Sequence, residues 1–139
     1  MDTTGTVGPG ICGDAHGAAG AGPLSTRVDL AQRMATRAHA HQVRQGSELP
    51  YIVHPARVVT TLRDVGVTDA DILAAAWLHD VVEDTRQTLH DVRVCVGDRA
   101  ARLVGLLTKV SPFDPTPYFG AIWADEDATA IKLATGSTT

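Results

Sequence analysis

The sequence has few aromatic residues, few cysteines and no long hydrophobic run. Aromatics make up 4% of its 139 residues, and its longest unbroken apolar stretch, Ile72 to Leu78, is far shorter than the roughly 20 residues that cross a bilayer. Its two cysteines, Cys12 and Cys95, are too few for a disulfide framework, which favours a reducing cytoplasm. The N-terminus also lacks the basic and apolar regions of a secretory signal.

A net positive charge is missing as well. The formal net charge is −4 and the pI is about 5.8, which argues against a protein whose main role is to grip nucleic acid. The basic residues are ten arginines and only two lysines. The length fits a single domain. We therefore expect a small soluble protein with neither a nucleic-acid nor a membrane partner, and composition leaves its oligomeric state open.

The first 23 residues differ in composition from the rest of the chain. Seven of the thirteen glycines lie there, and Val7 and Ile11 are the only long apolar side chains. Such a segment cannot bury enough surface to offset its conformational entropy. We predict a disordered tail over residues 1–23, with a targeting role as the alternative, and a folded domain over residues 24–139.

The domain is predicted to be all-α, with about six or seven helices and no strand. Capping boxes, glycine stops and a proline at a first helical position set the expected ends of the helices. These signals predict helices at about 26–43, 55–65, 68–83, 88–97 and 98–110, and one or two more within 118–134. Three prolines in residues 111–117 predict a turn-rich connection.

One imidazole and three carboxylates gather at the end of the third predicted helix. They are His79, Asp80, Glu83 and Asp84, and residues three or four apart share a helix face. Carboxylates this close destabilise one another, and a bound cation would reverse that effect. Imidazole and carboxylate ligands suit a divalent ion such as manganese or iron. The alternative is an acidic helix end solvated by water.

A second group of polar residues lies upstream. His54, at a loop-to-helix junction, can point towards another helix or be an ordinary polar residue near the surface. Arg44 can hold phosphate or stack on a base, or be a solvated charge. His39 and His41 are two residues apart on one helix and cannot both face one site. We expect His39 to be structural and His41 to be exposed.

These residues stand in four motifs that follow one another in order. They are AHxxQxRxG from Ala38, PYIxHP from Pro50, AAxLHDVVEDT from Ala75 and LVxxLTK from Leu103. In this order the chain resembles the HD-domain metal-dependent phosphohydrolases, and in particular the hydrolase domain of RelA/SpoT alarmone proteins and their small stand-alone relatives. The dipeptide HD alone is a weak signal, but YIxHP followed by LHDxxEDT at this spacing is specific.

The resemblance implies an HD-domain helical bundle with a divalent metal, usually manganese. His54, His79 and Asp80 would be the metal ligands. Glu83 and Asp84 would orient and activate the attacking water. In this family the substrate is typically guanosine tetra- or pentaphosphate, (p)ppGpp, which loses its 3′-pyrophosphate, and some relatives act on NADPH.

The resemblance also implies three substrate-binding residues. Arg44 would contact the base or a phosphate, and Tyr51 would help to frame the pocket. Lys109 would lie near phosphate or merely cap its helix. The implied activity is that of a guanosine-3′,5′-bis(diphosphate) 3′-pyrophosphohydrolase.

The end of the chain departs from the family pattern. Relatives carry a fourth ligand, an aspartate, in a late helix that reads KLAD, whereas Thr135 follows Ala134 here. Asp125 and Asp127 lie one or two turns upstream and would face elsewhere. We expect a domain without its last helices, as a truncation or frameshift would produce, with weakened metal binding and activity. An alternative of another class is a non-catalytic nucleotide-binding module.

Overall fold

The computed structural model describes residues 26–43, 48–109 and 113–137, and within these ranges the chain is helical. The predicted N-terminal tail, Cys12 and Arg44 lie outside the described residues. Seven helices have eight to twelve residues, and α5 is a single turn of four, which confirms the all-α prediction of six or seven helices. The helices are α2 (Arg27–Ala38), α3 (Val53–Asp64), α4 (Ala70–Leu78), α5 (Val81–Asp84), α6 (Leu89–Val96), α7 (Asp98–Leu107), α8 (Pro115–Trp123) and α9 (Glu126–Ser137).

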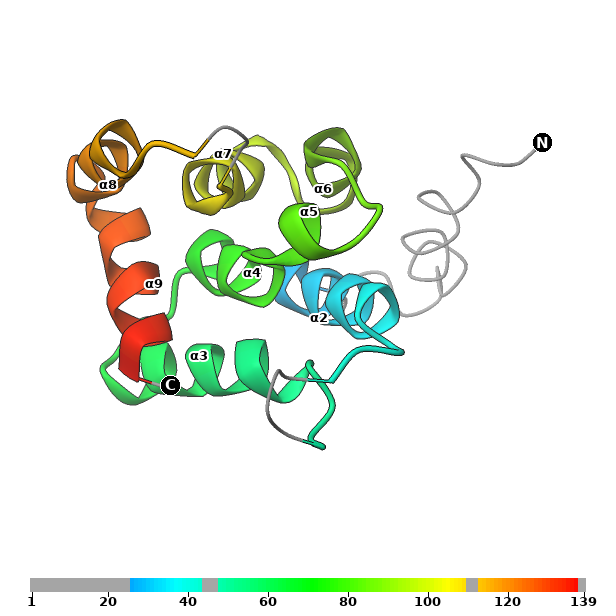
Figure 1. Cartoon of the computed structure of the whole chain (residues 1–139). Coiled ribbons are helices and arrows are strands. Elements are labelled where there is room, and N and C mark those ends of the chain that lie inside the picture. The colour runs from blue at the N-terminus through cyan, green and yellow to red at the C-terminus, as the bar shows by residue number, and fades with distance from the viewer. Residues whose placement is uncertain (1–25, 44–47, 110–112, 138–139) are drawn as a thin grey trace.

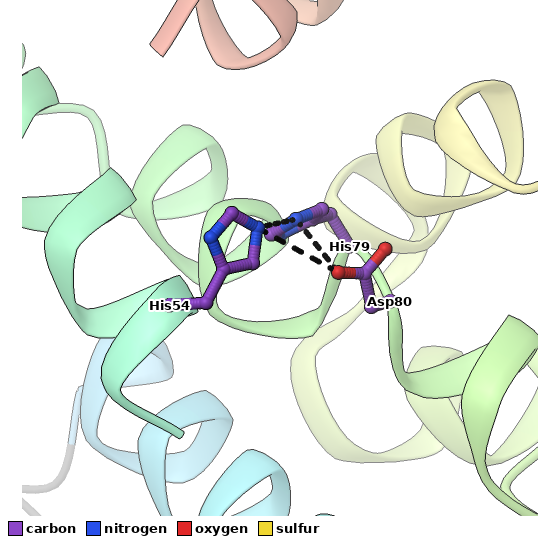
Figure 2. A group of neighbouring side chains, drawn as sticks. All are labelled: His54, His79 and Asp80. Carbon is purple, nitrogen blue, oxygen red and sulfur yellow. Dashed lines mark hydrogen bonds and ion pairs between the residues drawn. The ribbon is translucent and has the colours of Figure 1, made fainter. Parts of the chain in front are cut away.

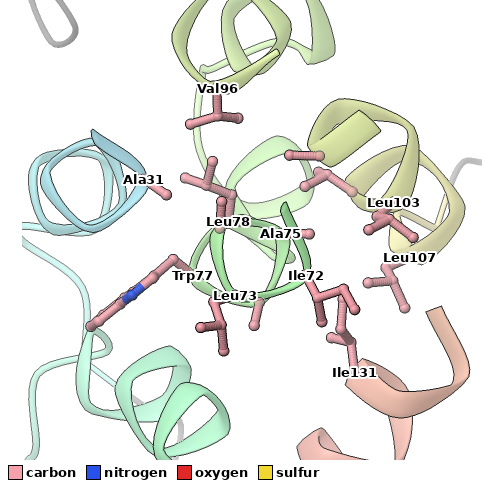
Figure 3. Packing of buried hydrophobic residues seen from close by; sticks show 14 of the residues in the cluster. Ala31, Ile72, Leu73, Ala75, Trp77, Leu78, Val96, Leu103, Leu107 and Ile131 are labelled. Atoms are coloured by element: carbon pink, nitrogen blue, oxygen red, sulfur yellow. The ribbon is translucent and has the colours of Figure 1, made fainter. Parts of the chain in front are cut away.

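Helix α4 lies in the middle of the molecule (Figure 1). Helices α2, α3, α6, α7 and α9 all contact it. Figure 3 looks along α4 and shows buried side chains packed around it from these neighbours. Residues 72–78 are all buried, because a helix that is apolar on every face has to be covered on every face. In the described ranges, no helix combines the length and the apolar character that crossing a bilayer requires.

Several predicted helix ends are confirmed. Thr26 caps α2 and Thr88 caps α6, each in a reciprocal capping box with the aspartate three residues on. Gly66 follows α3 and Gly97 follows α6, with φ angles of 95° and 96° that favour glycine. The N-cap of α4 is Asp69, not the predicted Thr68, because the Asp69 carboxylate accepts from the backbone N–H groups of the first turn.

The first helix is shorter than predicted and ends at Ala38 rather than at about Val43. Beyond it, the Gln42 carbonyl accepts a hydrogen bond of 2.8 Å from the Tyr51 N–H, and Val43 forms an isolated bridge with Pro50. The Gln42 N–H, which a helix to Val43 would direct to the Ala38 carbonyl, donates instead to the His39 carbonyl at 3.0 Å, so these contacts replace the last helical turn. They also fold the loop back so that the PYIxHP motif enters the molecule.

The next helix, α3, begins at Val53 and not at Pro55. A proline is tolerated in the first turn of a helix because the N–H groups there have no partner within the helix. This earlier start places His54 in the first turn of α3, and His54 is buried at 7% exposure.

The predicted helix 68–83 is interrupted. Helix α4 ends at Leu78, His79 and Asp80 form a turn, and α5 begins at Val81. The His79 ring contributes to this end because its Nδ1 lies 2.7 Å from the Ala76 carbonyl oxygen, an acceptor in the last turn of α4. The Asp84 N–H donates to the Asp80 carbonyl at 2.9 Å, so Asp80 still lies one helical turn before Asp84.

Helices α7 and α8 also differ from their predicted ends. Helix α7 ends at Leu107 instead of about Val110, and the Thr108 hydroxyl donates to the Val104 carbonyl at 2.7 Å. Helix α8 begins at Pro115, inside the predicted connection, with Asp114 as its N-cap. Proline suits this first helical position because it lacks an N–H and has a helical φ.

A cluster of ion pairs ties the N-terminal ends of α4 and α9 to α7. Arg99 Nη1 lies 2.8 Å from Asp69 Oδ1 and 3.3 Å from Asp71 Oδ2. Its Nη2 lies 2.6 Å from Asp127 Oδ2. The hydrogen bond from Arg99 holds the pKa of Asp69 below its usual value, against the opposing effect of burial. The cluster thus joins three helices through one guanidinium group.

We predict that Arg99→Met lowers the free energy of unfolding at pH 7 by about 1 kcal/mol, since it removes several partly exposed ion pairs. Because the pKa of Asp69 is lowered in the folded state, its stabilising effect is present above its unfolded pKa of about 4. The effect is lost as the pH falls through the folded pKa. Thermal unfolding should therefore show a difference between wild type and variant of a few degrees at pH 7 that shrinks below about pH 4.

The matched control is Arg93→Met, which removes one exposed pair with Asp98 on the surface. It should change the melting temperature by less than Arg99→Met at pH 7. A difference between wild type and Arg99→Met that stays constant down to about pH 3 would show that Asp69 is not the titrating partner.

Candidate metal centre

His54, His79 and Asp80 meet in the interior although 25 residues separate the two histidines. His54 comes from the first turn of α3, and the other two come from the turn between α4 and α5 (Figure 2). The His79 and His54 Nε2 atoms are 3.3 Å apart. Asp80 Oδ2 lies 3.1 Å from His79 Nε2 and 3.8 Å from His54 Nε2. One ligand atom from each residue therefore faces a common point.

These separations fit a divalent cation. With ligand bonds of about 2.1 Å, neighbouring ligand atoms are about 3.0 Å apart in octahedral geometry and about 3.4 Å apart in tetrahedral geometry. The three observed separations of 3.1, 3.3 and 3.8 Å have this size. Two imidazoles and one carboxylate can hold a divalent ion and leave further positions for water or substrate.

The outer contacts of the cluster orient its ligand atoms. Because the Ala76 carbonyl can only accept, the nearby His79 Nδ1 carries a proton, and Nε2 is the ring atom that faces His54 and Asp80. The Tyr51 hydroxyl donates a short hydrogen bond to Asp80 Oδ2. This type of support fixes the tautomer of a ligating histidine and the position of a ligating carboxylate.

The ionisation of His79 and Asp80 depends more on their contact with each other than on their burial. Burial alone would lower the pKa of His79 and raise that of Asp80. The hydrogen bond and the charge interaction between them outweigh burial, so the pKa of His79 is raised and the pKa of Asp80 is held well below its usual value. Asp80 is therefore ionised near neutral pH, as a metal ligand must be.

A cavity of about 320 Å³ opens onto the cluster. Its walls combine the three cluster residues with an acidic, a basic, an aromatic and a small polar group. The lining residues are His54, His79, Asp80, Glu83, Leu107, Lys109, Tyr118, Lys132, Thr135 and Gly136. A volume of this size is at the small end of the range for ligand pockets.

Glu83 and Asp84 line different hollows. Glu83 lines the cavity at the cluster, and its Oε1 accepts a hydrogen bond of 3.1 Å from the Lys109 N–H. Asp84 lines a neighbouring hollow that Arg37 and Arg86 also border. Burial raises the pKa of both carboxyls, and the negative charge of Asp80 adds to the rise.

Among the predicted substrate-binding residues, Lys109 lines the cavity, with its Nζ 5.5 Å from the centre of the Phe113 ring. Tyr51 lies behind Asp80 and is not among the residues that line the cavity. Arg44 lies outside the described residues. The structure therefore brings Lys109 to the cluster directly and Tyr51 to it through Asp80.

His39 and His41 behave as the sequence predicts. His39 is 2% exposed, its Nδ1 lies 3.0 Å from Gln42 Oε1, and its ring packs against Tyr51 at 4.6 Å between centroids. His41 is exposed. Gln42, the glutamine of the AHxxQxRxG motif, also donates to the Asp84 carbonyl at 3.0 Å. His39 and Gln42 thus support the loop that carries Tyr51.

Thr135, which follows Ala134 where relatives have the aspartate, lines the same cavity as the metal cluster. Its hydroxyl donates to the Lys132 carbonyl at 2.7 Å. The two upstream aspartates face elsewhere, as predicted: Asp125 pairs with Arg102, and Asp127 takes part in the ion-pair cluster on α7.

Tyr118 and Lys132 also line the cavity, and sequence reasoning does not identify them. Lys132 stands three residues before Thr135, so the two share a face of α9. That spacing is a signal in the sequence for Lys132. No comparable signal exists for Tyr118, which reaches the cavity because α8 packs on α7 and α9.

Comparison with known proteins gives a family and several relatives. The sequence profile of the HD domain matches residues 31–131. The human guanosine-3′,5′-bis(diphosphate) 3′-pyrophosphohydrolase MESH1 is 45% identical over 78 residues, which cover 53% of this chain and 42% of that protein. The bifunctional (p)ppGpp synthase/hydrolase SpoT of Escherichia coli is 39% identical over 84 residues, 60% of this chain and 12% of SpoT.

A solved structure has a similar fold. That structure is described as "A metazoan ortholog of SpoT hydrolyzes ppGpp and plays a role in starvation responses". The two structures share 30% sequence identity with a TM-score of 0.70, over 78% of this chain and 65% of the other. The chain spans less than half the length of the two curated relatives above.

We predict that Asp80→Asn and His79→Gln each weaken Mn²⁺ binding by at least about 100-fold, because each removes a ligand atom. Losing a residue that only orients a ligand already costs about 10–100-fold, and losing the ligand itself costs more. Isothermal titration calorimetry on the full chain measures this. His41→Gln, which changes an exposed histidine outside the cluster, is the control and should bind Mn²⁺ as wild type does. Equal affinities in all four proteins would place the metal elsewhere.

We also predict that Thr135→Asp tightens Mn²⁺ binding by about 10-fold or more, since it adds a carboxylate to a cavity that already holds three ligands. Thr135→Asn is the matched control, because it has nearly the same shape without the charge, and it should not tighten binding. A similar affinity for both variants would mean that position 135 does not reach the metal.

Proposed function

Because the chain belongs to the HD-domain family, we propose that it is a metal-dependent nucleotide pyrophosphohydrolase that removes the 3′-diphosphate from guanosine-3′,5′-bis(diphosphate). The observation that carries this proposal is the convergence of His54, His79 and Asp80 on one point at the edge of a cavity. Relatives named for hydrolysis of this nucleotide support the choice of substrate. We place the reaction in the cytoplasm.

In this proposal His54, His79 and Asp80 hold Mn²⁺. When bound, such an ion lowers the pKa of a coordinated water and polarises a phosphoryl oxygen. The ionised state of Asp80 and the orientation of His79 by the Ala76 carbonyl prepare the ligand atoms for it. Tyr51 acts as a positioning residue, because its hydroxyl is bonded to Asp80.

Glu83 is the proposed general base. Burial and the charges of Asp80 and Asp84 raise its pKa, which makes its carboxylate a better proton acceptor. Its Oε1 is held by the Lys109 N–H, so Oε2 is the atom that takes the proton from the attacking water. The water oxygen forms a bond to phosphorus as the bond from phosphorus to the 3′ oxygen breaks, and the proton taken by Glu83 is then available for the departing 3′ oxygen. The products are guanosine diphosphate and pyrophosphate.

The remaining predicted residues keep supporting roles in the proposal. Asp84 helps to orient water from the neighbouring hollow, next to Arg37 and Arg86. Lys109 contacts a phosphate from the cavity wall. Arg44 contacts the base or a phosphate of the nucleotide.

A second candidate function is a non-catalytic nucleotide-binding module. The observation that favours it is Thr135, which occupies the cavity wall at the place of the expected fourth carboxylate. Calorimetry with Mn²⁺ and the nucleotide on wild type and Asp84→Asn separates the two functions. Binding without turnover in both proteins supports the module and contradicts the enzyme.

We predict slow, Mn²⁺-dependent release of pyrophosphate from guanosine-3′,5′-bis(diphosphate), which chelation abolishes. Asp80→Asn should lower kcat/KM by at least about 100-fold, and Thr135→Asp should raise it, because the first removes and the second adds a carboxylate for the metal. Ion chromatography of the products measures the reaction, with NADPH as the comparison substrate. Faster release of phosphate from NADPH would contradict the proposed substrate.

A further inference from the structure

Both lysines of the chain line the cavity at the metal cluster. The chain has ten arginines and only Lys109 and Lys132 as lysines, and these two contribute to the same wall. They come from different places: Lys109 follows α7, and Lys132 lies on α9. A lysine is a compact, mobile point charge suited to phosphate.

Both lysines lie over the ring of Tyr118. Lys132 Nζ lies 3.4 Å from the Tyr118 hydroxyl oxygen and 5.4 Å from the centre of its ring. Lys109 Nζ lies 5.9 Å from the same ring centre. The Tyr118 hydroxyl itself donates to the Leu107 carbonyl at 3.0 Å, which fixes the ring in place. The two ammonium groups are therefore held on one aromatic residue.

Within the described residues, no ion pair joins either lysine to a carboxylate. Burial and the nearby charge of Lys109 lower the pKa of Lys132. The charges of Asp80 and Glu83 act on Lys132 in the opposite sense, but the two lysines still repel each other, and an anion placed between them would lower that cost. The cluster of His54, His79 and Asp80 lines the same cavity and can place a second phosphoryl group.

We propose that Lys132, held on Tyr118 beside Lys109, binds the terminal phosphoryl group of a diphosphate whose inner phosphoryl group lies at the metal cluster. This inference rests on the proposed function and deepens it, because it makes the 3′-diphosphate, rather than a monophosphate, the group that the cavity recognises. Lys132 is then a specificity-determining residue that touches the diphosphate transferred to water, and Tyr118 positions it.

The test measures how tightly Lys109 and Lys132 bind a phosphate anion when no metal is present. Inorganic pyrophosphate and orthophosphate are titrated into the full chain by calorimetry, in EDTA and at constant ionic strength. We expect Lys132→Met to weaken pyrophosphate binding by about 10-fold, the effect of losing a charge-assisted hydrogen bond, and to change orthophosphate binding less. Lys132→Arg, which keeps the charge, should retain most of the affinity. Tyr118→Phe should give an intermediate loss.

Arg93→Met is the matched control, since it removes one positive charge on α6, a helix that does not pack on α9. It should bind pyrophosphate as wild type does. Equal pyrophosphate affinity in wild type, Lys132→Met and Arg93→Met would overturn the inference, as would equal losses in the two variants. Circular dichroism and an unweakened Mn²⁺ affinity confirm that the Lys132→Met variant is folded.

Failure of this inference is distinguishable from failure of the proposed function. The pyrophosphate titration contains no divalent metal and no nucleotide, so it reports on the lysines alone. Absence of Mn²⁺ binding at His54, His79 and Asp80, or of turnover in both wild type and Thr135→Asp, counts against the hydrolase. Unchanged pyrophosphate affinity in Lys132→Met with normal Mn²⁺ binding counts against Lys132 only.

Discussion

The structure depends on the burial of one short helix that is apolar on all sides. Helix α4 cannot face water anywhere along residues 72–78, so other helices have to enclose it. Because α4 is enclosed, the polar residues His79 and Asp80 at its C-terminal end are also held inside the molecule. These polar groups are carried into the interior by the apolar residues before them. Burying them is tolerable only because they bond to one another, to His54 and to Tyr51.

The end of α4 gives the metal cluster its geometry. His79 and Asp80 lie in the turn between α4 and α5, and their ligand atoms are 3.3 Å and 3.8 Å from His54 Nε2, which comes from the first turn of α3 (Figure 2). The contact of the His79 ring with the Ala76 carbonyl joins the end of the helix to the orientation of a ligand atom. One local interaction thus serves both the fold and the site.

The sequence is a good guide to the helices and to the residue types of the site, but a poorer guide to the exact ends. Capping boxes at Thr26 and Thr88 and glycines with positive φ act within a few residues, so they are visible in the sequence. The end of α2 at Ala38 depends on a backbone hydrogen bond between Gln42 and Tyr51, nine residues apart. Such pairings arise from the folded loop and leave no periodic signal.

The same division applies to the site. His54, His79 and Asp80 are identified by their motifs, whereas the position of Tyr118 in the cavity wall follows from how α8 packs on its neighbours. Glu83 and Asp84 are adjacent in sequence and look equivalent, yet they line different hollows because consecutive residues of a helical turn point in different directions. Spacing along a helix predicts which residues share a face, but not what that face meets.

The net charge of the cavity wall depends on whether position 135 carries a neutral residue or a carboxylate. When ionised, Asp80 and Glu83 carry the negative charge of its wall, and Lys109 and Lys132 balance it. A divalent cation would leave this wall with a net positive charge, which favours a polyanion and disfavours the cation itself. A carboxylate in place of Thr135 would shift the balance towards the metal. The present wall is close to neutral, so a bound metal ion and a bound anion should each promote binding of the other.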